Sequence, residues 1–281
     1  MREIAEFRVN ERFASKLFAE NEGKRLGTSI RKIELDTTDP RFAEVGRLQH
    51  ELHAKHDESF FFGWNLWRKP TSQELRQAEL FLLRVLAVFE PAGEERGTKY
   101  DESSSCPKCG AGAKQIGPLI LDLKRIPKGK DIARTIAGEI VVSRRVAELF
   151  ERHGITGVTL VPVMLNAVSS AESKDWFQLN VQSANAEIIA PTRVGINPFD
   201  DDLAGECRCL QGDLIGLNLL SEVTIRRTTW GDTDFISSRQ FIGVRRGLLR
   251  PERLILVSPK AWKLIDAEKL KGVDVEIAHL V

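Results

Sequence analysis

The sequence is poor in several residue types and patterns, and each shortage excludes a class of protein. Only four cysteines occur in 281 residues, too few for a secreted domain held together by disulfides. No apolar run approaches the roughly 18 residues of a membrane span, and the charged N-terminus lacks the apolar core of a secretory signal. Neither sign of charge dominates, with 41 basic and 40 acidic residues, which argues against a generic nucleic-acid coat. We therefore expect a globular, cytoplasmic protein without a membrane segment.

The first 95 residues form a charged region in which helical patterns recur. Phe13, Leu17 and Phe18 follow helical spacing, and the Asp-Pro pair at 39–40 predicts the start of a helix that runs to about residue 56. We therefore expect a helix-rich N-terminal region over residues 1–95, followed by an α+β domain over residues 96–281.

Two apolar stretches stand out in the N-terminal region. Phe60–Trp67 is the most aromatic part of the chain, and it predicts either a core strand or a partner-binding patch anchored by Trp64 and Trp67. Leu80–Phe89 is apolar at nearly every position. Its pattern cannot separate a buried strand from a continuing helix, and we favour the strand.

The C-terminal domain contains the same strand–helix–strand pattern twice. In each copy a serine is placed to cap a helix, and a glycine follows it 14 positions later. A chance resemblance between two well-capped units would look similar, but several matches at one offset favour two related units packed in one α+β body with a mixed sheet. The matched pairs are Val142-Ser143 with Val257-Ser258, Leu149 with Leu264, and Gly157-Val158 with Gly272-Val273.

The four cysteines occur as two pairs, Cys106 with Cys109 and Cys207 with Cys209. Two residues between thiolates let both sulfurs reach one metal ion, and Gly110 allows the backbone to turn back, as in a zinc knuckle. The second pair has the shorter C-x-C spacing, which lacks that turn.

Three interpretations of the cysteines remain open: one structural zinc ion per chain held by all four thiolates, reduced cysteines without a ligand, and a redox pair. We favour zinc, because a redox C-x-x-C is expected at a helix start, whereas this one follows a loop of polar residues. An ion held by four thiolates has no open position, so the site would stabilise structure and would not catalyse.

Three histidines and a basic segment provide further candidate sites. The histidines, at positions 50, 53 and 56 of the predicted helix, could bind a second metal, but three histidines on a charged surface helix are usually just solvated. Residues 226–260 hold eight basic and three acidic residues, which could form a face for nucleic acid or for an anionic partner. Pairing within the chain, with the acidic residues of segment 200–213, is the interpretation we favour. The basic candidates for partner binding are Arg226, Arg227, Arg245 and Arg246.

Tyr100-Asp101 stands before Cys106-x-x-Cys109-Gly110, and Ile155-Thr-Gly157-Val158, Asp213–Glu222 and the phrase from Gln240 to Pro251 follow. In these residues, the sequence from about Tyr100 to the C-terminus resembles the bacterial double-CXXCG motif family, whose members include immunity factors paired with toxins. The chain departs from the family pattern at its second cysteine pair, where C-R-C-L replaces C-x-x-C-G. The resemblance implies a zinc-ribbon-like module and an immunity role.

Enzyme motifs are missing from the sequence. It has no G-x-S-x-G serine, no phosphate-binding loop and no dinucleotide fingerprint. We therefore expect a zinc-containing protein-interaction module rather than an enzyme. The expected role is a bacterial immunity protein that neutralises a toxin, and the alternative is a nucleic-acid-associated or defence-linked protein that uses the basic face of Arg226–Arg253.

Overall fold

The computed structural model describes residues 1–165, 171–203, 205, 208–209, 218–243 and 247–281. The chain forms two compact units. Unit 1 comprises Met1–Gln77 together with Ile196–Asp201, and unit 2 comprises Ala78–Gly195 together with Asp202–Val281. The division after Gln77 lies earlier than the boundary we expected at residue 95. No described helix has both the length and the apolar character needed to cross a membrane.

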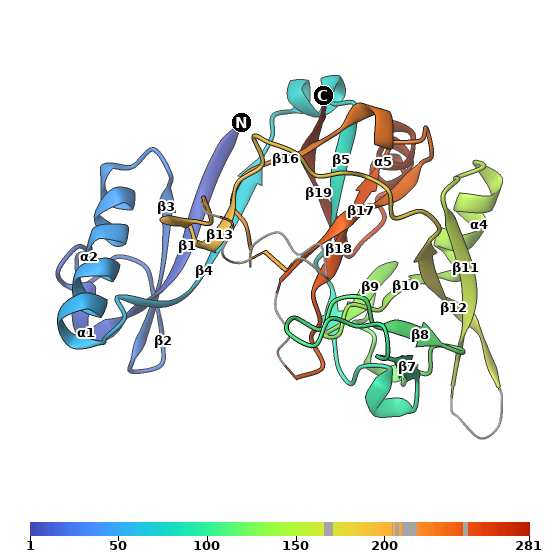
Figure 1. Ribbon diagram of the computed structural model, residues 1–281, viewed down its shortest axis with the longest axis horizontal. Helices are drawn as coiled ribbons and strands as arrows, with labels where there is room; N and C mark the ends of the chain where they lie inside the picture. The colour runs from blue at the N-terminus through green and yellow to red at the C-terminus, as the bar shows by residue number, and fades with distance from the viewer. Residues whose placement is uncertain (166–170, 204, 206–207, 210–217, 244–246) are drawn as a thin grey trace. The chain divides into compact units, whose positions relative to one another are not determined.

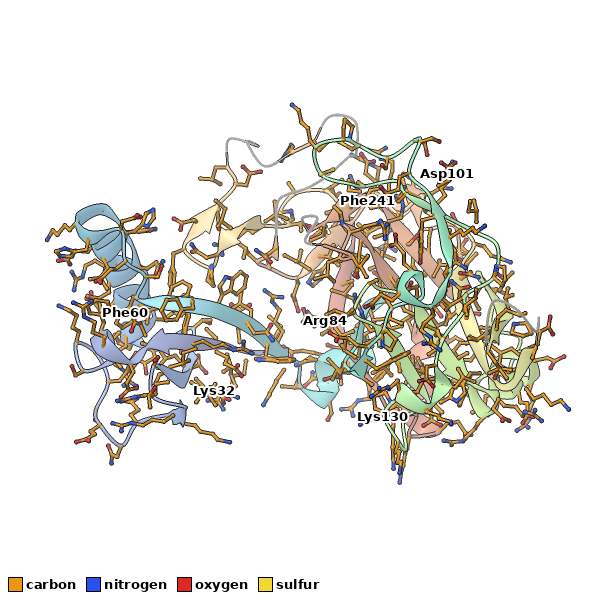
Figure 2. The ribbon with its side chains drawn as sticks, turned by 90° about the horizontal axis from the view of Figure 1, so that it is seen from below. Lys32, Phe60, Arg84, Asp101, Lys130 and Phe241 are labelled. Carbon is orange, nitrogen blue, oxygen red and sulfur yellow. The ribbon has the colours of Figure 1, made fainter. Side chains whose placement is uncertain are left out.

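Unit 1 is an antiparallel sheet with one long helix (Figure 1). Its strand order is β2-β3-β1-β4, and every pair is antiparallel. The core contains Phe7, Ile33 and Phe60, which are at most 1 % exposed; Phe60 is labelled in Figure 2. The elements are β1 (Arg2–Asn10), α1 (Glu11–Ala14), β2 (Lys24–Leu26), β3 (Ile30–Asp36), α2 (Pro40–His56), β4 (Phe61–Lys69) and α3 (Ser72–Gln77).

The predicted helix at 40–56 is confirmed as α2. The Asp39 side chain accepts a hydrogen bond from the Arg41 N–H, and Pro40 occupies the first turn, where its missing N–H costs nothing. The expectation of a helix-rich region was wrong at the N-terminus, where β1 precedes a single-turn α1. The reason is period-two burial: Ala5, Phe7 and Val9 are all 0 % exposed, whereas their neighbours are half-buried or exposed.

The short segment 196–201 belongs to unit 1 because Phe199 packs into the aromatic core of that unit. Its ring centroid lies 4.8 Å from that of Phe42 and 5.9 Å from that of Phe7. Gly46 on α2 makes room for it, since a Cβ there would lie 2.6 Å from the Phe199 ring. Asp200 follows, and its Oδ1 lies 2.6 Å from His50 Nε2.

Unit 2 contains two five-stranded mixed sheets, which confirms the α+β class (Figure 1). One sheet has the order β11-β12-β10-β9-β6, and the other has the order β16-β19-β5-β18-β17. In each, one edge pair is parallel and the other pairs are antiparallel. The elements of the two sheets and their helices are β5 (Leu80–Val85), β6 (Val88–Phe89), β9 (Ile132–Thr135), β10 (Ile140–Ser143), α4 (Arg144–Arg152), β11 (Val158–Met164), β12 (Glu172–Val181), β16 (Val223–Ile225), β17 (Phe235–Ile242), β18 (Glu252–Val257), α5 (Pro259–Ala267) and β19 (Val273–Leu280).

Smaller elements connect these sheets. Strands β7 (Lys99–Asp101) and β8 (Lys114–Ile116) form a hairpin, and β13 (Val194–Asn197) pairs through Val194 and Gly195 with β15 (Asn218–Leu219). The two-residue strand β14 (Asp200–Asp201) lies in the segment assigned to unit 1. Three 3-10 turns cover Glu94–Arg96, Leu123–Arg125 and Arg227–Thr229.

The two predicted strand–helix–strand units are present, and each lies within a larger repeated unit of four strands and one helix. We call β9, β10, α4, β11 and β12 the first repeat, and β17, β18, α5, β19 and β5 the second. In both, an antiparallel third strand separates the strand before the helix from the strand after it. That third strand follows the first repeat as β12, but in the second repeat it is β5, which comes early in the chain.

Matching residues form two junctions between the repeats, one at Gly157 and one at Gly272. The caps Ser143 and Ser258 have the same backbone angles, φ −68° and ψ 161°, and each accepts a hydrogen bond from the N–H three residues on. Gly157 of the first repeat lies against the Phe235 carbonyl of the second, and Gly272 lies against the Ile132 carbonyl of the first.

An aspartate accepts a backbone hydrogen bond at each of these two junctions. Asp234 of the second repeat accepts a hydrogen bond from the Thr156 N–H at 3.0 Å. Asp131, just before the first repeat, accepts one from the Lys271 N–H at 2.9 Å. Each aspartate therefore holds the loop that follows the helix of the opposite repeat, so the two halves of unit 2 interlock reciprocally.

Candidate metal centre

The first cysteine pair lies in the loop of the β7–β8 hairpin. The hairpin pairs Lys99 with Ile116 and Asp101 with Lys114, so its two strands bring both ends of the loop together. Inside the loop, the Cys106 N–H donates to the Ala111 carbonyl and the Gly110 N–H donates to the Cys106 carbonyl, both at 2.8 Å. Gly110 has φ 75°, a conformation that side chains rarely adopt. The predicted knuckle turn is therefore present.

Three cysteine sulfurs converge at this loop. Cys106, Cys109 and Cys209 place their Sγ atoms within 4.8 Å of one another, and Cys106 Sγ lies 2.9 Å from Cys209 Sγ. Cys106 and Cys109 are only 4 % and 7 % exposed. Phe241, labelled in Figure 2, packs against this cluster. Cys207, the fourth predicted ligand, lies outside the described residues.

The donor set suits a thiophilic metal ion. In a tetrahedral thiolate site with Zn–S bonds of about 2.3 Å, the sulfurs are about 3.8 Å apart. Cys106 and Cys209 are closer than this, and all three described sulfurs lie within 4.8 Å of one another. A small outward shift of Cys209 relative to Cys106 would admit an ion between them.

The environments of the two knuckle thiols differ. The hydrogen bond with Cys209, together with backbone N–H groups at Cys109 and Lys108, lowers the pKa of Cys106 to about 7. Burial raises the pKa of Cys109 to about 11. A cation between the thiols would favour the thiolate form of both, because opposite charge stabilises the ionised state.

A buried polar cluster that sequence reasoning missed anchors the base of the hairpin. Tyr100 on β7 donates from its hydroxyl to Glu139 Oε1 at 2.8 Å, and the Arg250 guanidinium lies 4.7 Å from the centroid of the Tyr100 ring. Arg250 also pairs with Glu102 at 2.6 Å and with Glu94 at 3.0 Å. Burial raises the pKa of Glu139, against the hydrogen bonds from Tyr100 and Gly93, which lower it. No local signal could reveal this cluster, because its members come from separate parts of the chain.

The three histidines of α2 do not gather into a metal site. His50 Nε2 contacts Asp200 Oδ1, and His53 Nδ1 lies 3.7 Å from Asp57 Oδ1. Among the residues that the structure describes, the ligand atoms that meet closely enough to hold a metal are those of the three cysteines. The solvated-surface interpretation of the histidines is therefore favoured.

The described basic residues of the 226–260 segment are engaged within unit 2. Arg226 and Arg239 both pair with Glu187, at 2.6 and 3.1 Å, and Arg227 pairs with Glu79 at 2.8 Å. The expected pairing inside the chain is present, but these partners differ from the expected acids of segment 200–213. The reason is strand geometry, which brings distant glutamates beside the arginines. Arg245 and Arg246 lie outside the described residues.

The aromatic stretch at 60–67 is a core strand in part. Phe61 and Leu66 of β4 are 6 % and 5 % exposed, and Trp64 packs against the core of unit 1. Trp67 is half-buried, and Phe62 is 59 % exposed. Because β4 is an edge strand of its sheet, one side of its backbone has no strand partner within that sheet. Trp64 thus serves the core, and the partner-binding role of Trp67 stays a prediction.

Comparisons of the sequence with known proteins give no match. No family model matches the chain, and no curated protein matches it.

Proposed function

We propose that the protein is an interaction module stabilised by one structural zinc ion per chain, with Cys106, Cys109, Cys207 and Cys209 as ligands. The observation that carries the proposal is the convergence of three described cysteine sulfurs in a largely buried cluster. Thiolates are the ligands that zinc prefers in closed structural sites, and four of them leave no position for substrate. The ion would supply structure, not chemistry.

The energetic case follows from the distance along the chain between the ligands. Cys106 and Cys209 are 103 residues apart in sequence, yet their sulfurs are in contact. An ion binding both would close a long loop, and its binding free energy would add directly to folding free energy. Because Cys106 and Cys109 precede the first repeat and Cys209 precedes the second, the ion would tie together the two segments that lead into the repeats.

The biological role we propose is neutralisation of a cognate toxin in the bacterial cytoplasm. It is supported by the resemblance to the double-CXXCG family. In this mechanism, a preformed surface covers the active site of the toxin, and charges at the rim set the rate of encounter.

The alternative of nucleic-acid binding has less support. Arg226, Arg227 and Arg239 each pair with a glutamate, so much of the expected positive face is neutralised. A labelled oligonucleotide titrated at rising salt tests this alternative: steep loss of affinity with salt would favour it, and absence of binding would exclude it.

Metal analysis tests the zinc site. Elemental mass spectrometry of the purified protein, with thiol titration before and after a chelator, should find one zinc per chain and four thiols that react only after chelation. The Cys109→Ser variant is the control and should carry less zinc. Metal-free protein with four freely reacting thiols would overturn the proposal.

A further inference from the structure

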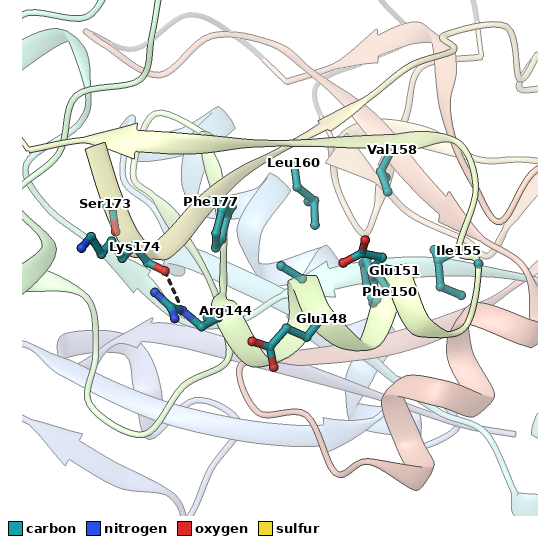
Figure 3. Close-up of a pocket in the computed structure, with 12 residues that line it drawn as sticks. Arg144, Glu148, Phe150, Glu151, Ile155, Val158, Leu160, Ser173, Lys174 and Phe177 are labelled. Carbon is teal, nitrogen blue, oxygen red and sulfur yellow. Dashed lines mark hydrogen bonds between the residues drawn. The ribbon is translucent and has the colours of Figure 1, made fainter. Parts of the chain in front are cut away.

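A groove runs along the first repeat between α4 and the strands β11 and β12 (Figure 3). Its volume is about 720 Å³. Figure 3 shows Leu160, Val158 and Phe177 pointing from the strands toward the helix, where Phe150 lies. Ala147 is the smallest side chain on the helix side of the groove.

The second repeat fills the corresponding place with its own tryptophan. Ala147 lies four residues after the cap Ser143, and Trp262 lies four residues after the cap Ser258. An aromatic residue also occupies the same position in the third strand of each repeat, Phe177 in β12 and Phe81 in β5. Phe177 pairs with Val142 and Pro162, and Phe81 pairs with Val257 and Ile277.

Trp262 covers Phe81, with ring centroids 6.0 Å apart, and Phe81 is 1 % exposed. Phe177, its counterpart, remains half-buried. The neighbouring pair behaves in the same way: Val275 is 4 % exposed, whereas its counterpart Leu160 is half-buried. The groove is therefore the space that an indole occupies in the other half of the same unit.

The rim of the groove carries charge that the described residues leave unpaired. Glu148 and Glu151 line the helix side, and neither forms an ion pair or a side-chain hydrogen bond with a residue that the structure describes. At the other end, Arg144 donates to the Lys174 carbonyl at 2.7 Å and lies 3.4 Å from Asp175. The exposed Lys174 side chain adds a positive charge at that end, away from Glu148 and Glu151. The helix side therefore presents negative charge next to an apolar floor.

We propose that this groove binds a tryptophan side chain of a partner protein, with a basic residue of the partner beside Glu148 and Glu151. The inference rests on the proposed interaction function for its biological meaning, but it does not depend on the metal. Aromatic anchors in well-shaped pockets dominate protein interfaces, and opposite charges at the rim select the partner. The groove thus supplies a docking surface that neither Trp67 nor the arginine segment supplies.

The first test uses indole as the probe and amide chemical shifts in NMR spectra as the readout. Indole should bind wild-type protein with a dissociation constant on the order of 1 mM, because it offers few atoms, and should shift the amides of Phe150, Ile155 and Phe177. Ala147→Trp should abolish these shifts by filling the groove, as Trp262 fills its counterpart. Ala54→Trp, on an exposed face of α2, is the matched control and should leave them unchanged.

The second test reverses the substitution and adds charge. Trp262→Ala should create a second indole site, with new shifts around Phe81. N-acetyl-Trp-Lys-amide should bind wild-type protein about two- to fivefold more tightly than N-acetyl-Trp-Glu-amide, a range typical of exposed ion pairs. Glu148→Gln with Glu151→Gln should remove that difference.

Two results would overturn the groove proposal: groove amides that do not respond to indole, or a response that persists in the folded Ala147→Trp variant. If Ala147→Trp does not fold, the second indole site in Trp262→Ala decides in its place. Zinc content measured on the same samples separates the outcomes, because a zinc-free protein that binds indole contradicts the metal proposal alone.

Discussion

The two repeats of unit 2 share their backbone junctions and differ in the side chains that cover them. Both have a serine cap with identical angles, a glycine pressed against a carbonyl of the other repeat, and an aspartate that accepts from the loop at that junction. At one helix position, however, the first repeat has Ala147 where the second has Trp262. The shared features hold the fold together, and the difference marks where one half remains open to a partner.

The largest effect is expected at the junction glycines. Gly272→Ala would place a Cβ 1.9 Å from the Ile132 carbonyl oxygen, and Gly157→Ala would place one 2.1 Å from that of Phe235. Because backbone must move in both cases and both glycines have positive φ, each variant should lose more than about 3 kcal/mol of unfolding free energy.

Gly154→Ala is the matched control for the junction glycines. Gly154 has φ 56°, but nothing lies within 4 Å of its added Cβ, so its cost should stay near 1 kcal/mol. Denaturant unfolding measures all three. Equal losses in the three variants would mean that the junction contacts do not distinguish Gly157 and Gly272 from an ordinary loop glycine.

The next largest effect on stability is expected from loss of the metal ion, which would link the two segments that lead into the repeats. Cys109→Ser should lower stability by several kcal/mol, because it removes a buried ligand and the loop closure that depends on it. A chelator should lower the melting temperature of wild-type protein and change that of Cys109→Ser much less. A Cys109→Ser variant that melts like wild type would contradict the zinc site.

A smaller effect on stability is expected from substitutions at the matching positions of the two helices, 147 in α4 and 262 in α5. Trp262→Ala should cost about 2 kcal/mol, less than a fully buried Trp→Ala, because Trp262 is half-buried over Phe81. Ala147→Trp should change stability by less than about 1 kcal/mol, since the groove already has room. Thermal unfolding of both variants provides the comparison, and a large loss in Ala147→Trp would show that the two helix environments are not equivalent.

The smallest effect is a pH dependence at the junction aspartate Asp234. Burial acts to raise the pKa of Asp234, but hydrogen bonds from Ser258, Thr156 and Lys260 outweigh it and lower the pKa. A lowered carboxyl pKa gives stability that is present above the unfolded value of about 4 and is lost as pH falls through the folded value. Unfolding measured from pH 6 to pH 2 should therefore show a weaker acid dependence in Asp234→Asn than in wild type. Asp232→Asn, at an exposed position, should behave like wild type.

Local signals predicted much of this architecture from the sequence. The Asp-Pro start of α2, the serine caps of α4 and α5 and the paired glycines act over one or two turns of chain, so they are visible in a single sequence. The strand expected within Leu80–Phe89 is confirmed as β5 and β6. The cysteine spacing likewise indicated the cluster that the structure describes.

The features that depend on long-range pairing were not predictable. Nothing local indicates that β5 completes the second repeat between β18 and β19, or that Phe199 enters the core of unit 1. The glutamates that pair with the arginines, and the buried Glu139, are also assembled by the fold. The groove likewise depends on the fold, because its lining comes from α4, β11 and β12, which only their packing brings together.

The coordination of the metal is tested most directly by X-ray absorption at the zinc edge. Wild-type protein should show four sulfur neighbours at about 2.3 Å. Cys207→Ser, which removes the ligand outside the described residues, should lower the number of sulfur neighbours. A shell of nitrogen or oxygen atoms, or a sulfur number unaffected by Cys207→Ser, would contradict a site built from both cysteine pairs.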